Sequence, residues 1–203
     1  MWTPALGRLE NKKMKKRLYL ISIYLFSILL LSGCSKFLYP IVDYSDAMID
    51  KSLLGLWEET SDSNETNNYI LILKDGNKSK YNVTIFDSKN FEFNEEDLPT
   101  NADLIYSGIF DNRKFIVVYL ENNNSYLFWE YEIEKDILRL FSVEDVVFEN
   151  AIYDKKIKGK ISGEGLNKEI LVEEKTENLQ KFIKENKKVF DKSSFIEFKR
   201  VIE

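Results

Sequence analysis

Hydrophobic and polar residues alternate along much of the chain after residue 53, with the two-residue period of a strand that buries one face. In 80–86, KYNVTIF, the residues Tyr81, Val83 and Ile85 share one face, opposite Asn82 and Thr84. In 126–133, YLFWEYEI, an apolar face opposes Glu130 and Glu132. Segments of the same kind cover 53–59, 69–74, 104–110, 115–120, 137–141, 168–172 and 194–202. The pattern therefore predicts a succession of half-buried strands.

Polar turn signals separate these segments and predict an antiparallel meander. KDGNK, DNRK, ENNNS and EKD each fall between two of them, and Gly, Asn and Asp are the residues that tight hairpin turns favour. Closing about eight to ten such strands into a barrel removes the exposed strand edges that invite aggregation. We expect a mainly β, barrel-like fold in a single domain over residues 53–203.

Two segments break the alternation and predict amphipathic helices that cover the sheet. The first, 142–154, has Ser142 as a possible N-cap and apolar pairs four residues apart. The second begins at Thr176. Its apolar face consists of Leu179, Phe182, Ile183, Val189 and Phe190. We take the glycines of 158–165, KGKISGEG, as turn residues, because they lack the spacing of a phosphate-binding loop.

Histidine is absent from the 203 residues, and Cys34 is the one cysteine. A serine or cysteine nucleophile activated by imidazole is therefore excluded, and so is an imidazole-ligated metal. Carboxylates, lysines, tyrosines and hydroxyls are the reactive groups that remain. We expect a non-catalytic protein without cofactor or metal, although a hydrolase based on carboxylates stays open.

The N-terminal region has the organisation of a signal peptide. A basic stretch at 12–17 precedes fourteen residues without charge at 18–31. Fourteen helical residues cover about 21 Å, less than the ~30 Å hydrocarbon core, which favours a cleaved signal over a permanent span. We assign residues 1–33 to the signal peptide and 34–52 to a lipidated N-terminus and short tether. Met14 is an alternative start, which would leave 1–13 outside the working protein.

The sequence Leu31-Ser32-Gly33-Cys34 resembles the lipobox of bacterial lipoproteins. The resemblance implies cleavage between Gly33 and Cys34, a diacylglycerol thioether on the Cys34 sulfur, and an acyl chain such as palmitate on its new amino group. Two or more chains anchor stably, whereas one holds only marginally. With Ser35 in the next position, the resemblance implies the outer membrane of a two-membrane cell. In a one-membrane cell it implies the outer face of the plasma membrane.

Removal of the leader makes the protein more acidic. Residues 1–34 hold six of the 29 basic and one of the 34 acidic residues, which leaves a net charge of −10. Such a domain does not favour nucleic acid. The predicted second helix carries lysines that could face anionic headgroups, or could form an ordinary solvated face. These residues are Lys181, Lys184, Lys187 and Lys188, with Lys192 just beyond.

The sequence Gly55-Leu56-Trp57 resembles the Gly-x-Trp motif that opens the first strand of lipocalins. The resemblance implies that Trp57 lies at the closed end of a barrel beneath an arginine from the last strand, here Arg200. The extra helix at 142–154 and the missing mid-chain Thr-Asp-Tyr depart from that family. The overall layout also resembles small bacterial lipoproteins with no assigned activity.

Two further groups of residues have alternative interpretations. The acidic stretch FEFNEEDLP could bind Ca²⁺ or supply an acid and a base for sugar hydrolysis, or it could be a solvated loop. Its carboxylates are Glu92, Glu95, Glu96 and Asp97. The aromatic residues Tyr126, Phe128, Trp129 and Tyr131 could line a ligand cavity or form plain core.

Two functions are consistent with these patterns. The first is a lipid-anchored envelope protein with a non-catalytic interaction or envelope-maintenance role and a protein partner. The second is a lipocalin-like carrier of a small amphiphilic, largely apolar ligand. A carrier predicts an open apolar cavity, whereas an interaction module predicts a filled core.

Overall fold

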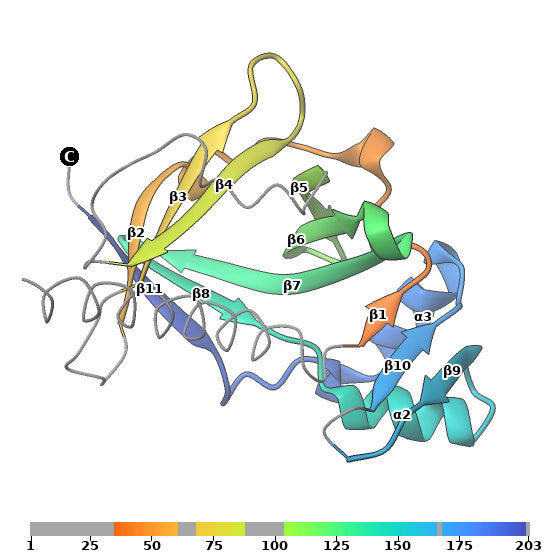
Figure 1. The fold of residues 1–203 in the computed structure, drawn as a ribbon. Helices are drawn as coiled ribbons and strands as arrows, with labels where there is room; N and C mark the ends of the chain where they lie inside the picture. The colour runs from red at the N-terminus through yellow and green to blue at the C-terminus, as the bar shows by residue number, and fades with distance from the viewer. Residues whose placement is uncertain (1–34, 61–67, 88–103, 166–167, 202–203) are drawn as a thin grey trace, which may run out of the picture.

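The computed structural model describes residues 35–60, 68–87, 104–165 and 168–201 (Figure 1). Eleven strands form one sheet. Eight of them are β2 (Gly55–Glu59), β3 (Asn68–Lys74), β4 (Tyr81–Asp87), β5 (Leu104–Phe110), β6 (Arg113–Leu120), β7 (Ser125–Glu134), β8 (Ile137–Phe141) and β11 (Ile196–Arg200). The other three are β1 (Lys36–Phe37), β9 (Gly159–Ser162) and β10 (Glu169–Val172).

The first eight strands named above, β2 to β8 and β11, close into an antiparallel barrel. Strands β2 to β8 pair with their neighbours in chain order, β11 pairs with both β8 and β2, and every one of these pairings is antiparallel. The β4–β5 seam is narrow, with one pair of partners, Tyr81 and Ile105. The predicted mainly β, barrel-like fold is therefore confirmed.

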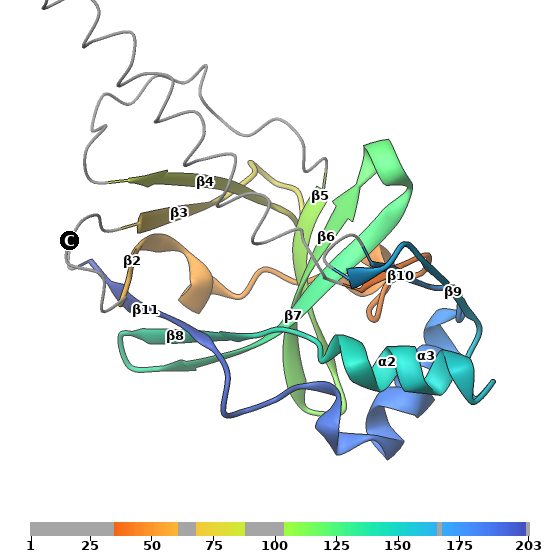
Figure 2. The same ribbon diagram turned by 60° about the horizontal axis from the view of Figure 1, so that its bottom comes forward.

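A second layer lies against one side of the barrel. It contains β1, β9 and β10 together with the helices α2 (Asp145–Tyr153) and α3 (Thr176–Glu185). A short 3₁₀ turn over Lys187–Val189 follows α3. Both views place this layer on the side of the molecule away from β2, β3 and β4 (Figures 1 and 2). Strand β1 joins the two parts, because it pairs with β7 of the barrel and, in parallel, with β10.

The apolar side chains form two separate cores on opposite faces of β5, β6 and β7. The barrel core fills the interior and consists of Leu53, Trp57, Ile72, Tyr81, Tyr131, Leu138 and Phe198. The outer core lies between the barrel and the helices, and its large members include Phe37, Ile41, Tyr106, Phe115, Phe128, Phe148, Leu179, Phe182 and Phe190. Strands with two covered faces lose the simple alternation of buried and exposed residues.

The two predicted helices exist, with shifted ends. Helix α2 begins at Asp145 rather than after Ser142, and Glu144 occupies its N-cap without a side-chain capping bond. Thr176 is the first helical residue of α3, and its hydroxyl donates to the carbonyl of Pro40 instead of capping the helix. The apolar face predicted for the second helix is buried at all five positions, although Val189 and Phe190 lie beyond the end of α3.

The expectation that 158–165 contains only turns is wrong. Residues Gly159–Ser162 form β9, which pairs with β10. A Cβ at Gly159 would lie 2.5 Å from the Cδ1 atom of Ile152. Glycine is therefore needed here because it allows the strand to approach α2 closely, and the turn composition misled the prediction.

Residues 35–52, expected to form a tether, are instead part of the domain. Phe37, Ile41 and Val42 are buried in the outer core. The carbonyl of Val42 accepts a hydrogen bond from the Tyr106 hydroxyl at 2.7 Å, and that of Ile41 accepts one from Gln180 at 2.7 Å. The segment is ordered because it fills the space between β5 and α3.

Candidate functional site

One end of the barrel is closed by a 3₁₀ turn over Lys51–Leu53 that leads into β2. The Trp57 indole donates to the carbonyl of Leu53 at 2.8 Å. The guanidinium carbon of Arg200 lies 4.1 Å from the Trp57 ring centroid. The same guanidinium donates to the carbonyls of Leu54 and Ser52, at 2.6 Å each. The structure thus brings Trp57 and Arg200 together, with the arginine also binding the segment that closes the barrel.

Gly55 has a geometric role in this closure. Its φ of +130° lies in a region that residues with a Cβ rarely adopt. A Cβ built at this position would lie 2.8 Å from an Arg200 guanidinium nitrogen. Because Gly55 has no Cβ, it leaves room for the Arg200 guanidinium, which stacks on the ring of Trp57 two residues later.

Asp50 lies just before the closing turn and binds groups from several strands. Its carboxylate accepts hydrogen bonds from Lys114 and Tyr131 at 2.8 Å each, and from the amide of Ser52 at 2.9 Å. Burial raises the pKa of Asp50, but the hydrogen bonds from Lys114, Ser52 and Tyr131 outweigh it and hold the pKa well below 3.8. Asp50 is therefore an ionised structural group at neutral pH.

Tyr81 extends this network into the barrel. Its hydroxyl accepts a hydrogen bond from the Asp50 amide at 2.7 Å and is hydrogen-bonded to the Ser107 hydroxyl at 2.7 Å. The Ser107 hydroxyl in turn donates to the carbonyl of Met48 at 2.6 Å. Burial raises the pKa of Tyr81. The network ties the segment before β2 to β4 and β5, where direct strand pairing is narrow.

Glu130, predicted on the polar face of β7, is 4% exposed because the outer core covers that face. Its carboxylate forms ion pairs with Arg113 and, at 2.6 Å, with Lys192. Burial raises the pKa of Glu130, but the hydrogen bonds from the two cations lower it by more, so the net shift is downward from 4.5. Both cations stack on aromatic rings, Lys192 at 3.7 Å from the centroid of Phe141 and Arg113 at 4.8 Å from that of Phe190.

A shallow pocket of about 310 Å³ opens beside this charged cluster. It is lined by Glu132, Arg139, Phe141, Lys192 and Phe195. Its cations are already paired: Lys192 contacts Glu132 at 2.9 Å, and Arg139 contacts Glu197 at 2.8 Å. The feature of this pocket that is open to a ligand is therefore the exposed aromatic ring of Phe195, because both cations are paired with carboxylates.

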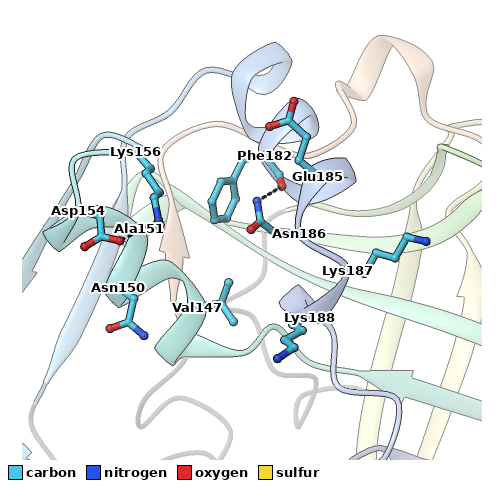
Figure 3. Close-up of a pocket in the computed structure, with 10 residues that line it drawn as sticks. All are labelled: Val147, Asn150, Ala151, Asp154, Lys156, Phe182, Glu185, Asn186, Lys187 and Lys188. Carbon is cyan, nitrogen blue, oxygen red and sulfur yellow. Dashed lines mark hydrogen bonds and ion pairs between the residues drawn. The ribbon is translucent and has the colours of Figure 1, made fainter.

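A second groove, of about 370 Å³, lies between α2 and α3 (Figure 3). Val147 from α2 and Phe182 from α3 point toward the space between the helices, while Lys187 points away. The side chain of Asn186 donates to the carbonyl of Phe182 at 2.7 Å and fixes the end of α3. This groove and the pocket beside Lys192 both lie on the outer side of the barrel.

The first described residue, Ser35, is fixed to the start of α2. Its amide and its hydroxyl both donate to one carboxylate oxygen of Asp145, each at 2.7 Å. Burial raises the pKa of Asp145, and this outweighs the lowering by the two bonds from Ser35. Position 35, adjacent to the predicted lipidation site, is therefore part of the folded domain.

The other predicted site residues fall into two groups. Gly33 and Cys34 lie outside the described residues, as do Glu92, Glu95, Glu96 and Asp97. Of the predicted aromatic group, Phe128 and Tyr131 are buried in different cores on opposite faces of β7, which is the arrangement of core residues.

The lysines of the second helix are exposed, and two of them have carboxylate partners. Lys184 pairs with Asp111 at 3.0 Å, and Lys192 pairs with Glu130 and Glu132. Lys181, Lys187 and Lys188 are exposed on α3 and the turn that follows it. Their placement fits a largely solvated face.

Asp50, Glu130 and Asp145 escaped the sequence analysis. Asp50 lies in a segment taken as a tether, and Glu130 alternates as a solvent-facing residue would. Asp145 sits in the first helical turn, where acidic residues are common for electrostatic reasons. The pattern Asp50-Lys51-Ser52, in which an Asp side chain accepts the amide two residues later, is a turn signal that could have marked the first of them.

Among the described residues, no group of three or more Asp, Glu, Cys or His side chains is arranged to hold a metal ion. In the same part of the chain, no helix has the length and apolar character needed to cross a membrane. Comparison of the chain with family models, curated proteins and solved structures finds no match.

Proposed function

We propose that this protein is a lipid-anchored bacterial envelope protein, attached through Cys34, with a non-catalytic interaction or envelope-maintenance role. The anchor is proposed on the basic stretch, the apolar run and the sequence LSGC. One structural observation supports it: Ser35, the residue that follows the proposed lipidated position, is held by Asp145 through its amide and its hydroxyl.

The interaction role is supported by how the barrel interior is filled. Trp57 is fully buried, Leu53 and Leu138 are each 1% exposed, and Tyr131 is 2% exposed. The closing turn and the Asp50 network occupy one end of the same interior. The two pockets described above lie outside the barrel, where a partner could reach them.

The carrier of a small amphiphilic ligand is the second candidate. A closed eight-stranded barrel with one sealed end is compatible with that function, because such barrels hold a single small ligand in other proteins. This candidate requires space in the interior beyond the barrel core. It also requires a ligand that remains bound during gentle purification.

Native mass spectrometry of the protein extracted from its own membranes separates the two candidates. A protein adduct would support the interaction role, and a small-molecule adduct lost on denaturation would support the carrier. The anchor is tested in the same sample, because cleavage and acylation change the mass of the N-terminal peptide beginning at Cys34. The matched control is Cys34→Ser, which should lack every acyl mass; an acylated control, or an unmodified wild-type Cys34, would contradict the anchor.

A further inference from the structure

The attachment of Ser35 leaves almost no free chain between the proposed lipid and the folded domain. The amide that donates a hydrogen bond to Asp145 belongs to the peptide bond between Cys34 and Ser35. Cleavage after Gly33 would therefore leave this hydrogen bond intact. Consecutive Cα atoms are about 3.8 Å apart. The next residues are equally fixed, because Lys36 and Phe37 form β1 between β7 and β10. An anchor at Cys34 therefore brings the headgroup layer to within one residue of the start of α2.

Helix α2 presents an unusual outward face at that point. Val146 and Tyr153, seven residues apart, share one face because two helical turns separate them. They are 54% and 65% exposed, the highest values among the large hydrophobic side chains that the structure describes. The opposite face of the helix is buried through Phe148 and Ala151. Two apolar side chains thus project from the element that holds the attachment point.

The charges around this face suit a lipid headgroup layer. The chain that leaves α2 carries Lys155 and Lys158, both exposed, in the sequence DKKIKGK. Two acidic residues near this face are paired with lysines, Glu149 with Lys168 at 2.5 Å and Asp154 with Lys156 at 2.8 Å, which reduces their repulsion of anionic lipids. Tyrosine, with an apolar ring and a polar tip, favours the headgroup level of a bilayer.

We propose that the domain lies directly on the membrane through the outward face of α2, in one orientation set by the bonds between Ser35 and Asp145. The proposal rests on the proposed acylation of Cys34. Its occupant is the lipid surface that receives the acyl chains of Cys34 itself. Two exposed side chains form too small an area for a stable protein interface, which needs about 800 Å² from each partner.

The orientation also determines which surfaces stay accessible. Asp145 and Glu149 lie on the flank of α2 toward Ser35 and Lys168. Val147 and Ala151 lie on the other flank and line the groove with α3 (Figure 3). The α2–α3 groove would therefore open beside the membrane, and the barrel would project away from it.

Depth-dependent fluorescence quenching tests this orientation in the acylated protein. Single thiols are introduced by Val146→Cys, Tyr153→Cys or the control Lys78→Cys and labelled with an environment-sensitive dye, the Cys34 sulfur being blocked as a thioether. Lys78 is 66% exposed in the turn between β3 and β4, on the opposite side of the molecule from α2 in Figure 1. Each variant is placed in nanodiscs containing anionic lipid and a lipid with a nitroxide in its acyl chain.

We expect quenching several-fold stronger at positions 146 and 153 than at position 78. Equal quenching at all three positions in protein of confirmed acyl mass would overturn the orientation and leave the anchor intact. Absence of acyl mass would overturn the anchor and with it this proposal.

A second variant tests the role of the attachment. Asp145→Ala, introduced into the Tyr153→Cys protein, removes both hydrogen bonds to Ser35 while the acyl chains remain. We expect quenching at position 153 to fall toward the level of position 78. Unchanged quenching would show that these bonds do not set the orientation, contrary to the proposal.

Discussion

The barrel core and the outer core lie back to back on β5, β6 and β7, but different parts of the chain build them. Every barrel strand contributes to the barrel core, which ends in the Asp50 network. The outer core joins the N-terminal segment to two helices, and Glu130 lies at its margin between two cations. The first core follows from closing a meander, whereas the second requires segments that are distant in sequence to meet. The shared strands imply that the two cores unfold together.

The largest effects should come from emptying each core in turn. Trp57→Ala in the barrel core and Phe148→Ala in the outer core should each lower the free energy of unfolding by about 3–5 kcal/mol and reduce the melting temperature. Urea denaturation followed by circular dichroism measures both. The control Tyr153→Ala, at an exposed position, should stay within about 0.5 kcal/mol of the wild type.

The same experiment tests whether the two cores unfold as one unit. Shared strands predict one cooperative transition in all three variants. If Phe148→Ala showed two transitions, with the barrel retained in the second, the cores would be independent units. An unchanged melt in Trp57→Ala would show that the stack with Arg200 contributes nothing.

Intermediate effects should come from the buried carboxylates. Both Asp50 and Glu130 have pKa values below those of the unfolded chain, so the unfolded state binds more protons in acid. Their stabilisation is therefore present above the unfolded values of 3.8 and 4.5 and is lost as the pH falls. Asp50→Asn and Glu130→Gln should each cost about 1–3 kcal/mol near neutral pH.

Acidification distinguishes this electrostatic role from simple packing. The stability difference between the wild type and each carboxylate variant should shrink as the pH falls below 4, measured as urea midpoints across a pH series. Asp50→Asn should reduce the acid dependence more, since its carboxylate accepts bonds from two side-chain hydroxyls in addition to Lys114. A difference that stays constant with pH would contradict the role assigned to ionisation.

A comparison of one buried tyrosine from each core includes the smallest expected effect, that of Tyr106→Phe. Tyr131 donates to the Asp50 carboxylate, whereas Tyr106 donates to the neutral carbonyl of Val42. Tyr131→Phe should therefore cost about 1.5–3 kcal/mol and Tyr106→Phe about 0.5–1.5 kcal/mol. Chemical denaturation resolves the order, and a larger loss in Tyr106→Phe would reverse the proposed ranking of the two polar environments.

The sequence predicted the barrel core well because a closed meander depends on local signals. Alternation and tight turns placed β5 and β8 at their observed ends, and the resemblance at Gly55-Leu56-Trp57 placed Trp57 near Arg200. The second helix could also be predicted, since its apolar face repeats with the helical period. In these elements, the pattern along a short segment reports which face is buried.

The outer core could not be predicted in the same way. Residues 36–42 contain no regular period, and their burial depends on β5 and α3 covering them from two sides. Glu130 alternates like a surface residue, and only Arg113 and Lys192, 17 and 62 residues away, make its burial tolerable. Such long-range partners leave no mark in the neighbouring sequence.

The closure at Arg200 also has a consequence for the order of events during folding. Arg200 binds the carbonyl of Leu54 across 146 residues of chain, and β11 is the strand that joins β8 to β2. Until residues 196–200 join the sheet, β2 and β8 each present an unpaired edge. The earlier strands can pair as they arrive, but completion of the cylinder waits for one late segment. Contacts of such long sequence separation form slowly, so the interval before closure is the period in which this protein is most exposed to aggregation.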